Sequence, residues 1–229
     1  MAHLLIRGGV AVALLAAAGC GGGGGPSPAT LVAESAASTE QVRSFHFTLD
    51  IEHVPRSATG LQLTSAEGDA IVPDRLSAQV SGTFAGIPLT TELVSVAGKL
   101  WIKNPLSGSW QTVDVGTTPA FLLDPQKGVL GVMRAVKGLE SDGSEDVGDV
   151  ATARVRGRAT AAEVGPLVAV SPGPGSVDVT LWIGKDDKIL RRIRVDGPVA
   201  QGETAEATRV VEVSRFGQSV EIAVPEGAK

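Results

Sequence analysis

The stretch Ser44-Phe45-His46-Phe47-Thr48-Leu49-Asp50-Ile51-Glu52 decides the fold. Its odd-numbered residues are large and apolar, and its even-numbered residues are polar. Successive side chains of a strand point to opposite faces, so this period of two predicts a strand with one buried face. The same alternation returns along most of the chain and predicts a protein built mainly of strands.

The other predicted strands follow one another with short turns between them. Pro73-Asp74 and Ala97-Gly98 are turn signals that separate neighbouring strands. Many sequential strands with short connections predict a large antiparallel sheet, which has to curve. The strands are expected within residues 61–72, 75–84, 87–96, 100–102, 110–115, 152–158, 177–183, 189–195, 208–213 and 220–224.

Helical spacing replaces the period of two in a few places. Thr160 and Glu163 have the spacing of a capping box, and Pro125 interrupts an apolar helical insert that is expected to lie on the open face of the sheet. A few helices on one face of a curved antiparallel sheet make the predicted fold class α+β. The predicted helical segments are 29–43, 118–136 and 160–170.

Length and composition limit the classes of function. The chain has 229 residues, a formal charge of −5 and a hydrophobic fraction of 43%, which suit a single domain with a sizeable core. A mildly acidic chain argues against nucleic acid as a partner. Aromatic residues make up 3% of the chain and tyrosine is absent, so few rings are present to stack on bases or sugars.

The beginning of the chain has the features of an exported protein. Arg7 precedes an apolar run from Val10 to Ala18, which is too short to span a bilayer as a helix. The run ends in small residues at Cys20, and this ending resembles the bacterial lipobox, in which the cysteine receives a diacylglyceryl group and becomes the new N-terminus. A plain secretory signal with an incidental cysteine is the alternative.

Cys20 is the only cysteine of the chain, so it cannot form an internal disulfide, and lipidation gives it a purpose. The glycine run that follows it predicts a flexible tether. We therefore expect a lipoprotein signal peptide in residues 1–19, a lipidated Cys20 with a Gly/Ser/Pro tether in residues 20–28, and one lipid-binding domain in residues 29–229.

No residue pattern points to an enzyme or to a metal site. The G-x-S-x-G pattern of a nucleophile elbow is missing from the sequence. His46 and His53 are seven residues apart on one predicted strand and so face opposite sides. The acidic segment 140–149 does not have EF-hand spacing and is expected to be a solvated hairpin. We expect no enzymatic activity, no metal and no cofactor.

Two interpretations of the interior remain open. A curved sheet with helices across its concave face either fills its interior with side chains or leaves a pocket, and the small residues that dominate this chain leave room for a lipid. A plainly packed core is the alternative. Arg191, Arg192 and Arg194 also have two interpretations, as contacts to lipid head groups or as exposed strand positions.

Six segments, in their order and spacing, resemble one family of bacterial lipoproteins. Together with the lipobox, they resemble the LppX/LprA/LprF/LprG lipoproteins known best from mycobacteria. The resemblance implies a half-open β-barrel with helices over its concave side, similar in shape to the carriers LolA and LolB. The segments are Ser44 to Asp50, Ser65 to Asp69, Gly98 to Lys103, Leu123 to Val129, Val179 to Ile183 and Arg194 to Pro198.

The resemblance also implies a function. It implies a membrane-anchored carrier on the outer face of the cytoplasmic membrane, which binds an acylated lipid or glycolipid in a hydrophobic cavity and carries it across the envelope. The membrane and a lipid exporter are further expected partners, and we expect a monomer. A tethered β-scaffold that docks an envelope protein, with no ligand inside, is the other class of function. The expected cavity residues are Phe45, Phe47, Leu49, Ile51, Leu76, Val80, Phe84, Leu89, Leu93, Val179 and Leu181, with Phe121, Leu122, Val129, Leu130 and Met133 in a helical lid.

Overall fold

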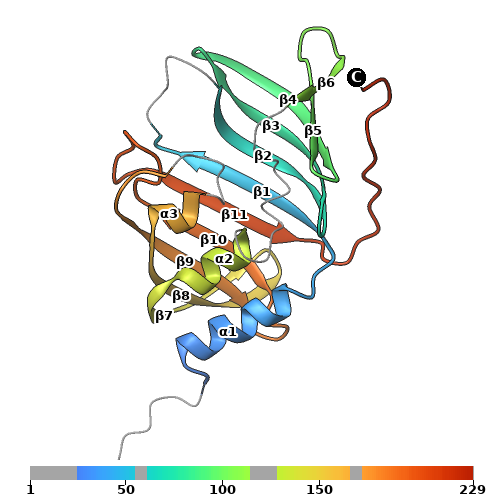
Figure 1. Cartoon of the computed structure of the whole chain (residues 1–229). Coiled ribbons are helices and arrows are strands. Elements are labelled where there is room, and N and C mark those ends of the chain that lie inside the picture. The colour runs from blue at the N-terminus through green and yellow to red at the C-terminus, as the bar shows by residue number, and fades with distance from the viewer. Residues whose placement is uncertain (1–24, 55–60, 114–127, 166–171, 229) are drawn as a thin grey trace, which may run out of the picture.

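The computed structural model describes residues 25–54, 61–113, 128–165 and 172–228. In these residues a single antiparallel sheet has the strand order β6-β5-β4-β3-β2-β1-β11-β10-β9-β8-β7. Two meanders, β1 to β6 and β7 to β11, therefore join along the pair β1–β11 (Figure 1). The strands are β1 (Ser44–Glu52), β2 (Leu61–Ile71), β3 (Arg75–Phe84), β4 (Ile87–Val96), β5 (Lys99–Lys103), β6 (Trp110–Val113), β7 (Lys137–Val147), β8 (Val150–Thr160), β9 (Ser176–Gly184), β10 (Leu190–Asp196) and β11 (Thr208–Ser214).

Three helices accompany the sheet in the described residues: α1 (Pro28–Thr39), α2 (Val129–Ala135) and α3 (Ala161–Val164). The predicted capping box at the start of α3 is confirmed, because the Thr160 side chain accepts from the Glu163 backbone and Glu163 accepts from the Thr160 backbone. The Thr160 hydroxyl also donates to the Glu163 carboxylate at 2.9 Å, and the bond from the Thr160 backbone together with this one holds the pKa of the Glu163 carboxyl below its ordinary value. The first part of the predicted helix 118–136 and the end of the predicted helix 160–170 lie outside the described residues.

The predicted fold class is confirmed. The protein is α+β, with one large curved antiparallel sheet and a few helices over its concave face (Figure 1). Within the described residues, β6 and β7 are the two edges of the sheet, which gives the half-open form of a barrel.

One prediction about a single segment was wrong. Residues 220–224 alternate between apolar and polar side chains but form no strand, because β1 and β10 already pair with both edges of β11. This segment is held instead by the Arg75 guanidinium, whose Nη1 donates to the Ile222 carbonyl at 2.9 Å. The predicted solvated hairpin at 140–149 is confirmed, because these residues form most of β7 and the turn to β8, pair with β8 antiparallel and are mostly exposed.

The three helices lie over β7 to β10 on one side of the sheet, its inner face (Figure 1). Leu31 of α1 and Met133 of α2 share one buried cluster with residues from most strands of the sheet. Phe47 and Leu49 of β1 belong to this cluster, so the inner face is the one that the alternation of β1 predicted to be buried.

At two glycines, β2 and β3 lie too close for a side chain. A Cβ atom at Gly68 would lie 2.1 Å from the carbonyl oxygen of Ser77, and one at Gly82 would lie 2.3 Å from the carbonyl oxygen of Gln62. The β2–β3 ladder also shifts register just after Leu63, and such irregularities bend and twist a strand. The bend of this half of the sheet therefore depends on residues without a side chain.

We expect Gly68→Ala to lower the free energy of unfolding by about 1–3 kcal/mol, because the added methyl group meets β3 backbone and no rotamer change can relieve the clash. Denaturant unfolding followed by circular dichroism measures the effect. Gln79→Ala, at an exposed position of β3, is the matched control. A Gly68→Ala protein as stable as this control would contradict the close approach of the two strands.

Candidate functional site

The candidate site is the inner face, which the strand register builds rung by rung. Leu49 of β1 lies beside Ala66 of β2, and Ala66 lies beside Val80 of β3. On another rung, Ala78 of β3 lies beside Leu93 of β4. The apolar residues predicted on separate strands therefore share one face, as expected from their alternation.

The half of the inner face under the helices is a packed core. Val179 and Leu181 of β9 are fully buried, and Ile193 of β10 is almost so. Thr39, the last residue of α1, accepts a hydrogen bond from the Leu190 backbone at 3.1 Å, and Arg134 of α2 pairs with Glu40 at 3.1 Å. These contacts fix the helices on the sheet.

The other half, from β1 to β4, leaves apolar side chains partly open to solvent. Phe45, Ile51 and Leu93 pack against the core but are only partly buried. Val129 and Leu130 of α2 are also partly buried, at the border between the two halves. Partly exposed apolar side chains that share one face are the kind of surface on which an apolar ligand binds.

The predicted cavity residues therefore fall into groups by depth. Phe84 is 56% exposed at the end of β3, and Phe121, Leu122 and Cys20 lie outside the described residues. The buried members are Phe47, Leu49, Leu76, Val80, Met133, Val179 and Leu181, and the partly buried members are Phe45, Ile51, Leu89, Leu93, Val129 and Leu130.

A charged pair on the inner face was not predicted. Arg209 of β11 lies in register between Ile51 and Val195 and is 2% exposed. Its Nη2 donates to the Glu203 carboxylate, whose other oxygen accepts from the Val199 and Ala200 backbone at 2.9 and 3.0 Å. Alternation predicts the face on which Arg209 lies, but the sequence gives no sign that a carboxylate six positions away would neutralise it.

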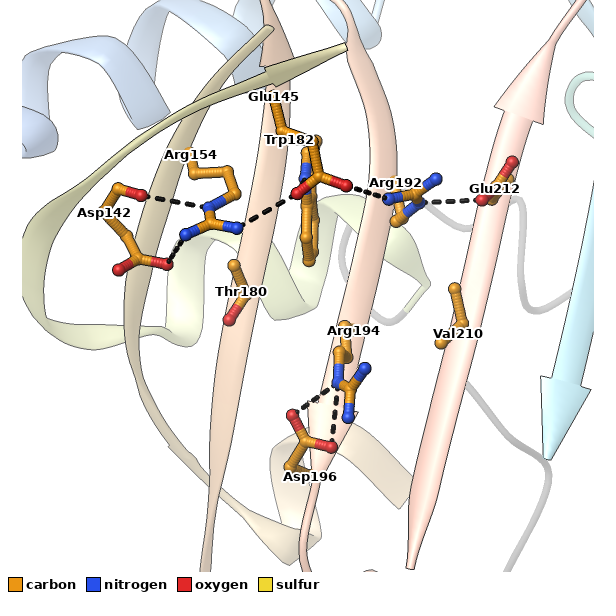
Figure 2. Close-up of a pocket in the computed structure, with 10 residues that line it drawn as sticks. All are labelled: Asp142, Glu145, Arg154, Thr180, Trp182, Arg192, Arg194, Asp196, Val210 and Glu212. Atoms are coloured by element: carbon orange, nitrogen blue, oxygen red, sulfur yellow. Dashed lines mark hydrogen bonds and ion pairs between the residues drawn. The ribbon is translucent and has the colours of Figure 1, made fainter. Parts of the chain in front are cut away.

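The outer face carries a network of arginines and carboxylates around a depression of about 410 Å³ (Figure 2). Glu145 of β7 is at its centre. One Glu145 oxygen accepts from Arg154 at 3.0 Å and from the Trp182 indole at 3.1 Å, and the other accepts from Arg192 at 3.2 Å. Arg192 also donates to Glu212 at 2.7 Å. One carboxylate thus connects four strands.

The Trp182 ring adds to this network. The guanidinium carbons of Arg192 and Arg154 lie 5.1 and 6.0 Å from its centre, distances at which a cation is attracted to an aromatic face.

The other two arginines of β10 also form ion pairs. Arg194 pairs with Asp196 at 2.8 Å, and Arg191 pairs with Asp187. Each of the three arginines of β10 that the sequence singled out therefore has a carboxylate partner, which the sequence did not predict.

The described residues offer no metal site. No group of three or more His, Cys, Asp or Glu side chains in them is arranged to hold a metal ion. His46 lies on the outer face, 3.2 Å from Glu67 and 3.0 Å from Asp69, while His53 follows the end of β1 and is exposed. Gln218 donates to Asp69 at 2.7 Å, so this cluster ties the C-terminal segment to β2.

The sequence pattern of the LppX_LprAFG lipoproteins matches residues 27–222, nearly all of the described fold. The chain belongs to this family. Its match extends from the residue that caps α1 to the segment that packs beside Arg75, so both meanders of the sheet are part of the shared pattern. The resemblance expected from the six sequence segments is therefore confirmed.

Individual members of the LppX_LprAFG family agree with this assignment. The chain is 27% identical over 203 residues to the lipoarabinomannan carrier protein LprG of Mycobacteroides abscessus, covering 86% of this chain and 84% of that one. The crystal structure of LprF from Mycobacterium bovis has a TM-score of 0.70 at 20% identity, covering 88% of this chain and 97% of LprF. The Mycobacterium tuberculosis lipoprotein LppX has a TM-score of 0.62 at 20% identity, covering 86% and 98%. At this sequence identity, the similarity to LprF and LppX shows a shared fold.

Among the described helices of this LppX_LprAFG protein, none is both long and apolar enough to cross a bilayer.

The outer-face network makes stability depend on pH through Glu145. Its hydrogen bonds from Trp182 and Arg154, together with the charge of Arg192, hold the pKa of the Glu145 carboxyl below its ordinary value of 4.5. Because the folded-state pKa is the lower one, the carboxylate stabilises the fold above pH 4.5, and this contribution disappears as the pH falls through the folded-state pKa.

We therefore expect Glu145→Gln to be less stable than the wild-type protein at about pH 7, and the difference to shrink at about pH 3. Denaturant unfolding at both pH values measures it. Asp149→Asn, in the exposed turn after β7, is the control and should show a smaller pH-dependent difference. A difference between wild type and Glu145→Gln that is the same at both pH values would count against the role of the carboxylate.

Proposed function

We propose that this protein is a membrane-anchored lipid carrier. It binds an acylated lipid or glycolipid on the open half of its inner face and carries it across the cell envelope. Binding and release, with no chemical turnover, are its activity. Cys20 holds it at the outer face of the cytoplasmic membrane after the signal peptide, residues 1–19, is removed, and it acts as a monomer that receives or passes its lipid through an exporter.

One observation carries the proposal. The inner face from β1 to β4 keeps large apolar side chains partly exposed, beside the partly buried Val129 and Leu130 of α2. Each methylene group of an acyl chain that leaves water on such a surface stabilises the complex by about 0.8 kcal/mol. The affinity of a long acyl chain can therefore come from burial alone, and the head group is free to vary.

Two further facts support it. The family is one of lipoproteins, which agrees with a lipid at Cys20, and its LprG member from Mycobacteroides abscessus is named as a carrier of lipoarabinomannan, an acylated glycolipid. A glycolipid is accordingly the ligand class that we favour. The packed half under the helices lets the fold persist while the open half exchanges ligand.

Native mass spectrometry tests the proposal. The chain with Cys20→Ser, which removes the anchor, is purified from its own or a related host. A mass excess that organic extraction resolves into an acyl lipid is the expected result. A bare polypeptide mass, together with no uptake of offered lipids, would instead favour a tethered scaffold that docks an envelope protein.

A single substitution tests where the lipid lies. Val80 is on the inner face, between Ala66 and Thr91 on the neighbouring strands. We expect Val80→Trp to abolish the lipid mass excess, because the indole fills the space that an acyl chain would occupy, while circular dichroism remains that of the folded protein. Gln79→Trp, which puts the same ring on the outer face of β3, should keep the lipid. Normal loading of Val80→Trp would contradict the placement.

A further inference from the structure

One end of the sheet carries an unusual group of exposed apolar side chains. The antiparallel order of β3, β4, β5 and β6 brings the β3–β4 turn and the β5–β6 turn to the same end (Figure 1, top). We call residues 84–91 and 104–112 the β3–β6 tip. Among the described residues, four large apolar side chains are exposed: Phe84 (56%), Ile87 (69%), Leu106 (96%) and Val224 (50%). The first three are at the tip.

The β3–β6 tip carries no charge. Residues 84–91 and 104–112 contain no Asp, Glu, Lys, Arg or His, although 20% of the whole chain is charged. The first charged residues behind the tip are Glu92 and Lys103, which pair with each other at 2.7 Å. The Lys103 ammonium also lies 5.8 Å from the centre of the Trp110 ring. Lysine and tryptophan behind an apolar end are the residues typical of a membrane–water interface.

Several polar groups of the β5–β6 turn are paired with one another within the turn. Asn104 Oδ1 accepts from the Leu106 and Ser107 backbone at 2.9 and 3.1 Å, and its carbonyl accepts from Gly108 at 2.8 Å. The Ser107 and Ser109 hydroxyls bond to each other at 2.7 Å. Each of these paired groups costs less to remove from water than an unpaired one, which favours entry of the turn into a lipid layer.

The tip is also continuous with the inner face. Phe84 pairs with Ile87 on the outermost rung of β3 and β4, and alternate positions of β4 lead inward through Leu89 and Thr91, whose hydroxyl donates to the Lys103 carbonyl, to Leu93. Phe84 and Ile87 are therefore the rim of the surface on which the acyl chain is proposed to bind. An apolar path connects that surface to the end of the molecule.

We propose that the β3–β6 tip enters the interfacial layer of a lipid membrane, and that acyl chains pass between this membrane and the inner face along β4. This inference rests on the proposed carrier function for the passage of acyl chains, but the membrane contact stands on the tip alone. A lipid surface fits the tip better than a protein partner does, because the tip has no charge for specific recognition and exposes three large apolar side chains.

The test measures membrane contact on the full chain with Cys20→Ser, purified with any lipid it holds. Vesicles of phosphatidylcholine with brominated acyl chains should quench the fluorescence of Trp110, which is partly exposed at the tip, whereas Trp101 and Trp182 are buried. Trp110→Phe should remove this quenching. Flotation with the same vesicles measures how much protein is bound, whether or not lipid is found in it.

Leu106→Asp is the deciding variant, because Leu106 lies on the tip but outside the proposed acyl path. We expect it to reduce vesicle binding on the order of tenfold, because a charge is expensive in an apolar layer, and to leave lipid loading unchanged. Val224→Asp adds the same charge at the other exposed apolar position and should bind vesicles like the parent protein. Equal binding of the two variants would overturn the inference.

The outcomes separate this inference from the carrier function. A protein that carries lipid but neither floats with vesicles nor shows quenching of Trp110 would overturn the membrane role of the tip and leave the carrier function intact. A protein that lacks lipid but binds vesicles through Leu106 would overturn the carrier function and leave the membrane role of the tip intact.

Discussion

The structure depends on how closely β2 and β3 can approach. At Gly68 and Gly82 a Cβ atom would lie within 2.3 Å of backbone on the neighbouring strand, so the bend of this half of the sheet exists only where these side chains are absent. The bend makes one face concave. A flat sheet of the same composition would expose β1 to β4 on both sides, whereas a concave face surrounds an acyl chain on more than one side and buries more of it.

The second organising feature is the uneven cover of that concave face. Helices cover the half from β7 to β10, where the inner residues of β8 to β10 are mostly buried, and leave the half from β1 to β4 partly open. The packed core and the proposed binding surface therefore lie on different strands of one sheet. The two meanders meet along β1 and β11, so the packed half can keep the register of the whole sheet while the proposed ligand binds to and leaves the open half.

Sequence reasoning succeeded where the information is local and failed where it depends on distant neighbours. The alternation of Phe45 to Ile51 predicted both the strand and its buried face. It could not show that residues 220–224, with the same alternation, would follow a strand, β11, whose two edges are already paired. Alternation also predicts on which face of the sheet a residue lies, but not how close it is to the end of the strand. Phe84 was therefore expected in a cavity, but it is 56% exposed at the end of β3.

Charged residues were the hardest to interpret for the same reason. Nothing near Arg209 in the sequence indicates that it would be buried against Glu203, and nothing near Glu145 indicates that its partners would be Arg154, Trp182 and Arg192. The partners of these side chains are set by strand order, and strand order in a sheet of this size is a property of the whole chain.

The edge strand β7 has a consequence for how copies of this protein behave beside one another. Its ladder with β8 is interrupted twice, and Gly138 and Gly143 have positive φ angles of 62° and 86° at these places. Charged side chains fill much of the rest of the strand. Bulges and charges are the means by which open sheets avoid strand addition by another molecule. A half-open barrel with a bare edge would be prone to join edge to edge into fibres when many copies crowd on one surface, and β7 is built to resist this.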